Sequence, residues 1–343
     1  FRTALAGVLQ SGSGPDGRRR RPADARTVFD ALNAKAAIFA IETLFAERGM
    51  RLPVIVSSTL TSSGRTLAGQ TIEAFYTSVA HAEPLAVSLN CSFGAKALLP
   101  YLERLAAVSE FRVAVYPNAG LPNVMGGYDE TPAMFAADVE EYMRRGLVNL
   151  VGGCCGTTPL HIFELAKIVN NYTPRPLPQR RHVTCLSGLE QLRIVPEANF
   201  VNVGERTNVA GSAKFARLIP RKIRGSSLGG PRPSRSGRNI VDVCMDDGLI
   251  DGPEAMRDFL NLMGSEPEIA AVPVMIDSSK WEVLETGAPG GAGQERRQFH
   301  LPEGGRAGIS APRPPHPPLR SRRRGDALRR AGTGRHLCPQ DRR

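Results

Sequence analysis

Short apolar runs alternate with longer helix-like segments between residues 27 and 170. Parallel strands need a long crossover connection, usually a helix, and helices on both faces of the sheet leave the strands almost continuously apolar. The chain has this rhythm, because one helix-like segment separates each apolar run from the next. The predicted strands are residues 53–57, 85–90, 112–116 and 147–151, and the predicted helices are residues 29–48, 72–81, 95–108 and 133–145. This pattern predicts an α/β fold with a parallel sheet, and it fits four units of a (β/α)8 barrel.

A second series of strands and helices follows a proline-rich stretch at residues 173–178. Its predicted strands are residues 199–203, 239–243 and 272–276, and its predicted helix is residues 253–263. We therefore expect two partial (β/α)8 barrels in tandem, accompanied by disordered basic segments. The expected divisions are a basic lead at 1–26, the first barrel at 27–172, a linker at 173–198, the second barrel at 199–287, and a disordered tail rich in Arg, Pro and Gly at 288–343.

The net charge of +11 on 343 residues suggests at first a protein that binds nucleic acid or an anionic membrane. The charge is concentrated in residues 13–26, 220–238 and 288–343, which carry +3, +6 and +9, so the rest of the chain carries −7. A nucleic-acid surface interleaves basic residues with folded structure and aromatic side chains. These stretches have almost no aromatic residues, and we therefore expect no nucleic-acid partner.

The cysteines and the apolar runs bear on the compartment. No run of about 18 apolar residues is present, so we expect no membrane span. The chain has six cysteines and no leading apolar signal segment. Thiols stay reduced in the cytoplasm, where they bind metals rather than form disulfides. We therefore expect a cytoplasmic protein with free cysteines.

Two adjacent cysteines, Cys154 and Cys155, lie in a glycine-lined turn after the predicted strand at 147–151. Neighbouring strand residues point to opposite faces, so two adjacent thiols can face one target only where the backbone leaves strand geometry, which flanking glycines permit. Cys91 ends another predicted strand and offers a third thiol. A catalytic zinc ion uses three protein ligands and keeps a fourth position open. The pattern favours a metal site over the alternative, a pair of small buried residues.

The other predicted strands also end in polar residues, as is typical of the active-site face of a (β/α)8 barrel. In the first series these residues are Ser57, Ser58, Thr59, Asn90 and Asn118. In the second series, Asp246 and Asp277 follow strands. The Asp277 carboxylate could accept two N–H donors from the edge of a polar heterocycle. The alternative role for both aspartates is helix N-capping.

Several long motifs resemble the cobalamin-dependent methionine synthase family. Residues 27–189 resemble the family's homocysteine-binding barrel through the segments FDALNAK at 29–35, PNAGLPN at 117–123 and GGCCGTTP at 152–159. Residues 200–219 and 239–287 resemble its pterin-binding barrel through VGERTNVAGS at 203–212 and MDDG at 245–248. Related single-barrel thiol methyltransferases share the cysteine motif but lack the second series, so that series favours the two-barrel family.

The resemblance implies a methyltransferase that moves a methyl group from 5-methyltetrahydrofolate through cobalamin to zinc-bound homocysteine, giving methionine and tetrahydrofolate. It implies that Cys91, Cys154 and Cys155 bind zinc and that the homocysteine sulfur is the fourth ligand, with no catalytic residue beyond these ligands. The implied folate-binding residues are Gly211, Ser212, Ala213 and Asp277, with Asn208, Glu205 and Asp246 as further members. Methylcobalamin would be held by a cobalamin-binding domain of the full-length enzyme, which we expect this chain to lack.

The chain departs from the family at the edges of each match. Arg26 stands where the family has an acid able to hold the substrate amine, and residues 220–238 and 288–343 replace expected elements with Arg-, Pro- and Gly-rich sequence. A GC-rich reading frame gives such sequence when it is translated in a shifted phase. The alternative function is therefore an inactive truncated or frameshifted fragment with no catalytic role. A basic scaffold or RNA-binding protein that uses the Arg tracts is a further alternative.

Overall fold

The computed structural model describes residues 22–179, 183–212, 215–216, 219 and 239–287, together with the backbone of residues 296–298. The described residues form two parallel sheets and one separate hairpin. This is an α/β fold with parallel sheets and helices, consistent with (β/α)8-type domains. None of the helices in these ranges combines the length and apolar character needed to cross a bilayer.

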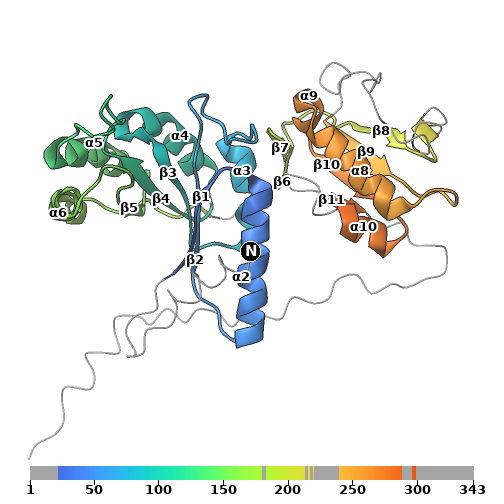
Figure 1. The fold of residues 1–343 in the computed structure, drawn as a ribbon, viewed down its shortest axis with the longest axis horizontal. Coiled ribbons are helices and arrows are strands. Elements are labelled where there is room, and N and C mark those ends of the chain that lie inside the picture. The colour runs from blue at the N-terminus through green and yellow to red at the C-terminus, as the bar shows by residue number, and fades with distance from the viewer. Residues whose placement is uncertain are drawn as a thin grey trace, which may run out of the picture. The chain divides into compact units, whose positions relative to one another are not determined.

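The first sheet has five parallel strands that lie side by side in sequence order. They are β1 (Ala23–Val28), β2 (Val54–Ser58), β3 (Ala86–Gly94), β4 (Arg112–Asn118) and β5 (Leu150–Val151). The helices between and after them are α2 (Ala31–Arg48), α3 (Ile72–Val79), α4 (Ala95–Val108), α5 (Pro132–Arg144) and α6 (Pro159–Ile168), with single 3-10 turns at Ala80–Ala82 and Val169–Asn171. Figure 1 shows α2 to α6 arranged around the five strands. The sequential order is that of a (β/α)8 barrel, in which each strand pairs with the next one along the chain.

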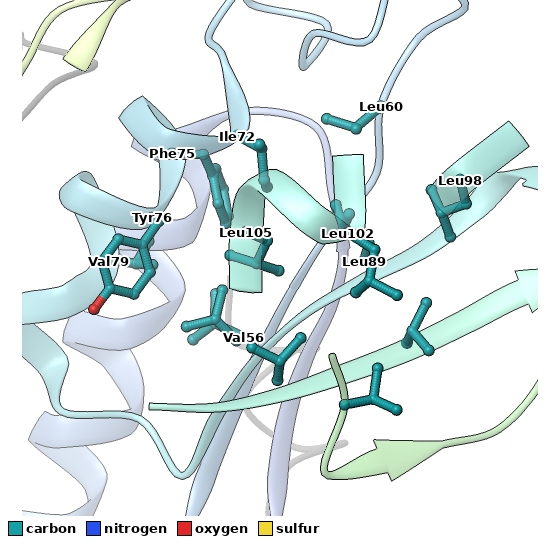
Figure 2. Packing of buried hydrophobic residues seen from close by; sticks show 14 of the residues in the cluster. Val56, Leu60, Ile72, Phe75, Tyr76, Val79, Leu89, Leu98, Leu102 and Leu105 are labelled. Carbon is teal, nitrogen blue, oxygen red and sulfur yellow. The ribbon is translucent and has the colours of Figure 1, made fainter. Parts of the chain in front are cut away.

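The main core of this unit lies between the strands and the helices. Val56 and Leu89 point from β2 and β3 toward Phe75 of α3 and toward Leu102 and Leu105 of α4 (Figure 2). Successive strand residues face opposite sides of a sheet. Ile55, Ala86 and Ala114 therefore form a small cluster on the other face.

That second face becomes polar toward the carboxyl ends of the strands, because Ser57, Asn90 and Asn118 occupy the same alternating positions and are buried. Its apolar part is small, whereas the polar part collects at one end of the sheet. The candidate site lies at that end.

The second sheet is also parallel, with the order β11-β10-β9-β8. Its strands are β8 (Val203–Asn208), β9 (Ile240–Cys244), β10 (Val274–Asp277) and β11 (Arg296–Gln298), and its helices are α8 (Gly252–Gly264), α9 (Pro267–Ala270) and α10 (Trp281–Gly287). Val243 and Ile276 of the strands pack with Met256, Phe259 and Leu284 of the helices in a separate core. Asp251, not Asp246, caps the N-terminus of α8 by accepting the Glu254 N–H at 3.0 Å.

The structure differs from the sequence-based divisions at the start of the first unit. Residues 23–26 were expected to belong to a basic lead, but they begin β1, and Ala23 and Ala25 pair in register with Val54 and Val56 of β2. The small side chain of Ala23 is buried in the core. The sequence did not predict this strand because a run of arginines lies just before it.

The expected linker at 173–198 also contains regular structure. The strands β6 (Thr184–Ser187) and β7 (Gln191–Ile194) form an antiparallel hairpin. Arg175, at the start of this segment, is buried and donates hydrogen bonds to the carbonyls of Ala106, Ser109 and Phe111. The packing around the first sheet therefore extends into the proline-rich stretch.

The remaining expectations of disorder fall mostly outside the described residues. Residues 1–21, 220–238, 288–295 and 299–343 lie there. Within the expected tail, Arg296–Gln298 pair with β10 as β11. The first strand of the second sheet, expected at 199–203, is found at Val203–Asn208.

Candidate metal centre

Three cysteines meet at the carboxyl end of the first sheet. Cys91 lies near the end of β3, where the backbone turns through left-handed conformations at Cys91 (φ 63°) and Ser92 (φ 64°) and the pairing with β4 is interrupted. Cys154 and Cys155 lie in the loop between β5 and α6. The backbone therefore departs from regular strand geometry both at Cys91, within β3, and at Cys154 and Cys155.

The glycines around Cys154 and Cys155 allow other groups to approach the backbone closely. A Cβ on Gly152 would lie 2.8 Å from the Tyr116 ring, and one on Gly156 would lie 2.3 Å from the Tyr128 ring. Gly156 also has a φ of +78°, which L side chains rarely adopt. The glycine frame thus serves close packing of two aromatic rings against the cysteine loop, as well as its turn.

The distances between the sulfurs suit a shared metal ion. The Sγ atoms of Cys91 and Cys155 are 3.5 Å apart, those of Cys154 and Cys155 are 3.9 Å apart, and all three lie within 4.8 Å of one another. A tetrahedral zinc ion with bonds of about 2.3 Å places its sulfur ligands about 3.8 Å apart. The cluster could therefore hold a metal ion. Cys185 and Cys244 are free thiols outside it, and Cys338 lies outside the described residues.

Two of the three thiols have shifted proton affinities in the cluster. Burial raises the pKa of Cys154, but hydrogen bonds from Asn90 and from the neighbouring thiols outweigh this effect and hold the pKa below its usual value. The hydrogen bond with Cys91, together with burial, raises the pKa of Cys155 to about 11. Three adjacent thiolates repel one another, so full deprotonation requires a cation. A bound metal supplies that charge.

A cavity of about 440 Å³ opens beside the cluster. Cys91 and Cys155 contribute to its wall, and the remaining wall is formed by hydroxyl, amide and apolar side chains: Thr27, Phe29, Thr59, Leu60, Thr61, Leu67, Ser92, Asn118, Leu121, Pro122 and Tyr128. No charged side chain belongs to this lining set. The cavity has room for a small thiol whose sulfur reaches the cluster.

Arg26 brings a positive charge to the same end of the sheet. Its Nη2 donates to the carbonyl of Gly153 at 3.2 Å, directly before Cys154, and its guanidinium lies 4.4 Å from the centre of the Tyr116 ring. An acid at this position would present a carboxylate for an ammonium group. Arg26 offers the opposite charge.

The polar residues of the second sheet also gather at its carboxyl edge. Asn208, Cys244 and Asp277 occupy matching register positions on β8, β9 and β10. Asp246 accepts hydrogen bonds from Ser278 Oγ at 2.5 Å, Ser279 N at 2.6 Å and Ser279 Oγ at 2.7 Å. Burial raises the pKa of Asp246, but these bonds outweigh it and hold the pKa below its usual value. Asp246 thus orders the turn that follows Asp277.

The other residues expected to bind folate are less completely placed. Asn208 Oδ1 accepts from Gly211 N at 3.2 Å, so the turn at Gly211 folds back on the end of β8, and Ser212 Oγ accepts from Phe215 N at 3.3 Å. Glu205 is exposed on β8. Ala213 lies outside the described residues.

Glu130 and Asp138 form a pair of carboxyl groups that the sequence did not predict. Burial and the neighbouring Asp138 raise the pKa of Glu130 to about 7. Lys96, on the helix that follows Cys91, pairs with Asp138 at 3.1 Å. The Glu130 carbonyl contacts His161 Nε2 at 3.1 Å, in the first turn of α6. Glu130 and Asp138 are eight residues apart and match no known motif, and their partners Lys96 and His161 are distant in sequence, so no sequence signal identified the pair.

Two segments of the chain match known protein families. Residues 25–169 match the homocysteine S-methyltransferase family, and residues 204–294 match the pterin binding enzyme family. The chain thus joins a segment similar to homocysteine S-methyltransferases to a segment similar to pterin binding enzymes. This combination is consistent with the methionine synthase resemblance of its motifs.

Solved structures of the homocysteine methyltransferase MmuM from Escherichia coli show limited likeness. The apo form is 22% identical over 42% of this chain and 48% of that chain, with a TM-score of 0.32. The metallated form is 26% identical over 38% of this chain and 40% of that chain, with a TM-score of 0.27. The chain thus spans less than half the length of each of these two structures.

Proposed function

We propose that the homocysteine S-methyltransferase segment binds zinc through Cys91, Cys154 and Cys155 and presents homocysteine sulfur at the fourth position. The observation that carries this proposal is the convergence of three thiols, within 4.8 Å of one another, at a cavity of about 440 Å³. Zinc bound to a thiol holds it as a thiolate at neutral pH, which makes the sulfur a nucleophile for a methyl group. The uncharged wall of the cavity orients the thiol without competing for the metal.

The pterin-binding segment is proposed to bind 5-methyltetrahydrofolate. Its candidate contacts are Asp277, Asn208, Asp246, Glu205, Gly211, Ser212 and Ala213. The arrangement of Asn208, Cys244 and Asp277 in register supports a common binding edge. A carboxylate such as Asp277 can accept two N–H donors of a planar ring, and Asp246 keeps the turn after it in place.

The complete reaction is methyl transfer from 5-methyltetrahydrofolate through cobalamin to homocysteine, giving methionine and tetrahydrofolate. Cobalamin carries the methyl group between the two substrates and would be supplied by a cobalamin-binding domain as partner. We place the reaction in the cytoplasm, because a reducing compartment keeps zinc-binding thiols free. All five cysteines in the described ranges are free.

An inactive fragment is the competing function, and the position of Arg26 favours it. A cation beside the Cys154 loop repels the ammonium group of homocysteine. A sheet with fewer than eight strands also provides fewer loops to contact the substrate than a closed barrel does. A chain of this kind could bind zinc without supporting turnover.

Calorimetric titration of homocysteine into the zinc-loaded chain separates the two functions. Saturable binding with proton release, lost in Cys155→Ser, supports thiolate capture on the metal. No heat with homocysteine, despite bound zinc, supports the inactive fragment. Binding of 5-methyltetrahydrofolate that is lost in Asp277→Asn but kept in Asp258→Asn, an exposed position on α8, tests the second segment.

A further inference from the structure

Asn90 is the residue before Cys91 and is almost fully buried, with 1% of its surface exposed. Its carboxamide makes four hydrogen bonds, which is one for each donor hydrogen and each acceptor lone pair. Oδ1 accepts from Ser57 Oγ at 2.6 Å and from Thr27 N at 3.2 Å. Nδ2 donates to Thr27 Oγ1 at 2.9 Å and to Cys154 Sγ at 3.9 Å.

These bonds fix which way the carboxamide faces. A flipped side chain would place its NH2 against the Thr27 N–H, and donors do not bond to donors. The Ser57 hydroxyl adds a second bond to the same oxygen from β2. The N–H group is therefore held toward Cys154 by partners on two other strands.

Thr27 is the second reason for assigning Asn90 a special role. Thr27 has a φ of 59°, and a β-branched residue is a rare occupant of the left-handed region. Such strain persists only where surrounding contacts enforce it. Both the backbone N–H and the hydroxyl of Thr27 bond to Asn90, and Thr27 and Cys91 line the same cavity. The Asn90 side chain thus joins a strained cavity residue to one of the candidate metal ligands, Cys154.

We propose that Asn90 is a positioning residue that orients Cys154 for metal binding through its N–H···S contact and couples that thiol to the Thr27 wall of the cavity. This proposal rests on the proposed zinc site. Hydrogen-bond partners of metal ligands set the ligand orientation, and their loss typically lowers metal affinity about 10- to 100-fold. The donor side of Asn90 faces a sulfur that carries negative charge when metal is bound. An isosteric acceptor in its place repels that sulfur.

The test compares Asn90→Asp and Asn90→Ala in the full chain, with zinc affinity measured by chelator competition. Asn90→Asp keeps the shape and replaces the N–H donor by an oxygen, whereas Asn90→Ala removes the group. We expect dissociation constants for zinc raised about 10-fold in Asn90→Ala and more, toward about 100-fold, in Asn90→Asp. The thiolate-to-metal charge-transfer band of the cobalt-loaded protein should shift in both. A residue that only fills space gives the opposite order, because the isosteric variant would then be the milder one.

Asn149→Asp is the matched control. Asn149 is a partly buried asparagine that likewise both accepts and donates hydrogen bonds. It accepts from Val113 N at 3.0 Å and donates to the Arg175 carbonyl at 2.7 Å, and it lies before β5 rather than at the cysteines. It should change stability without changing the cobalt spectrum. If both Asn90 variants fail to fold by circular dichroism, Ser57→Ala replaces them and should weaken zinc binding by a smaller factor; unchanged affinity there overturns the proposal.

The outcomes also separate this inference from the function on which it rests. If the wild-type chain binds no zinc, the metal site fails and the role of Asn90 fails with it. If the wild type binds zinc and Asn90→Asp binds it equally well with the same cobalt spectrum, only the role of Asn90 is overturned.

Discussion

Replacement of Arg175 should destabilise the first unit strongly, although the residue lies in a stretch that looks like a linker. Its guanidinium donates to the carbonyls of Ala106 at 2.7 Å, Ser109 at 2.6 Å and Phe111 at 3.1 Å. Ala106 is in the last turn of α4, whose final carbonyls have no partner within the helix. Burial lowers the pKa of Arg175, but the guanidinium remains charged. Arg175 therefore satisfies buried acceptors and complements the helix dipole.

The size of the effect follows from these three bonds. A hydrogen bond to a charged group contributes about 1.5–3 kcal/mol, and the contributions of bonds to one group are not additive. Arg175→Met leaves these carbonyl acceptors without their charged donor, so we expect it to lower the free energy of unfolding by about 2–4 kcal/mol. Arg175→Lys keeps one charge but cannot reach all three carbonyls, and it should give an intermediate loss.

Urea denaturation followed by circular dichroism measures this prediction. Arg112→Met is the control, because Arg112 is exposed at the start of β4 and directly follows Phe111, one of the residues that Arg175 contacts. Its effect should stay within about 0.5 kcal/mol. Equal stabilities of the Arg175→Met and Arg112→Met proteins would show that the buried guanidinium does not anchor α4 and that the linker expectation was right.

Three further predictions concern the loops of the metal centre and turnover. The pKa of Glu130 is raised from 4.5 to about 7, so the stabilisation that its protonated form contributes is fully present below about pH 4.5 and is lost as the pH rises through 7. In denaturation experiments from pH 5 to 8, the wild type should lose stability relative to Glu130→Gln, and parallel stability curves would contradict this. Gly156→Ala should weaken zinc binding because the added Cβ would clash with the Tyr128 ring, whereas Gly126→Ala, at a similar φ of +77° with no atom within 4 Å of its Cβ, should not. Equal zinc affinities of the two variants would contradict an effect of this clash. The chain with zinc and free methylcobalamin should not form methionine at an ordinary rate of about 1 s⁻¹ or more, because incomplete positioning of the substrates lowers the reaction rate by many powers of ten. A rate in that range would refute the inactive-fragment alternative.

The parallel α/β pattern was predictable because apolar strands and helices repeat with a regular spacing. The helix expected at 95–108 has those bounds in the structure, and the strands at 53–57 and 239–243 are displaced by one residue. Between residues 152 and 198, two regular elements were not predicted from the sequence. No helix was predicted at Pro159–Ile168, where Thr158 and His161 form a capping box, and no hairpin after residue 183.

The candidate site was predictable in part, for a specific physical reason. Cys91, Cys154 and Cys155 occupy the ends of parallel strands, and such ends meet at one edge of a sheet. The orientation of Asn90 and the left-handed conformation of Thr27 depend on tertiary contacts between distant segments. Local sequence patterns do not predict such contacts. The strand Ala23–Val28 was not predicted because arginines surround it in sequence, and its pairing with β2 and its bonds to Asn90 are tertiary contacts.

X-ray absorption at the zinc edge tests the central claim most directly. The zinc-loaded chain should show three sulfur scatterers at about 2.3 Å, supplied by Cys91, Cys154 and Cys155, and a fourth at the same distance after homocysteine is added. Cys91→Ser should lose one of them. A first shell with fewer than three sulfurs in the wild type, or a sulfur count that stays at three with saturating homocysteine, would contradict zinc-bound thiol capture at this cluster.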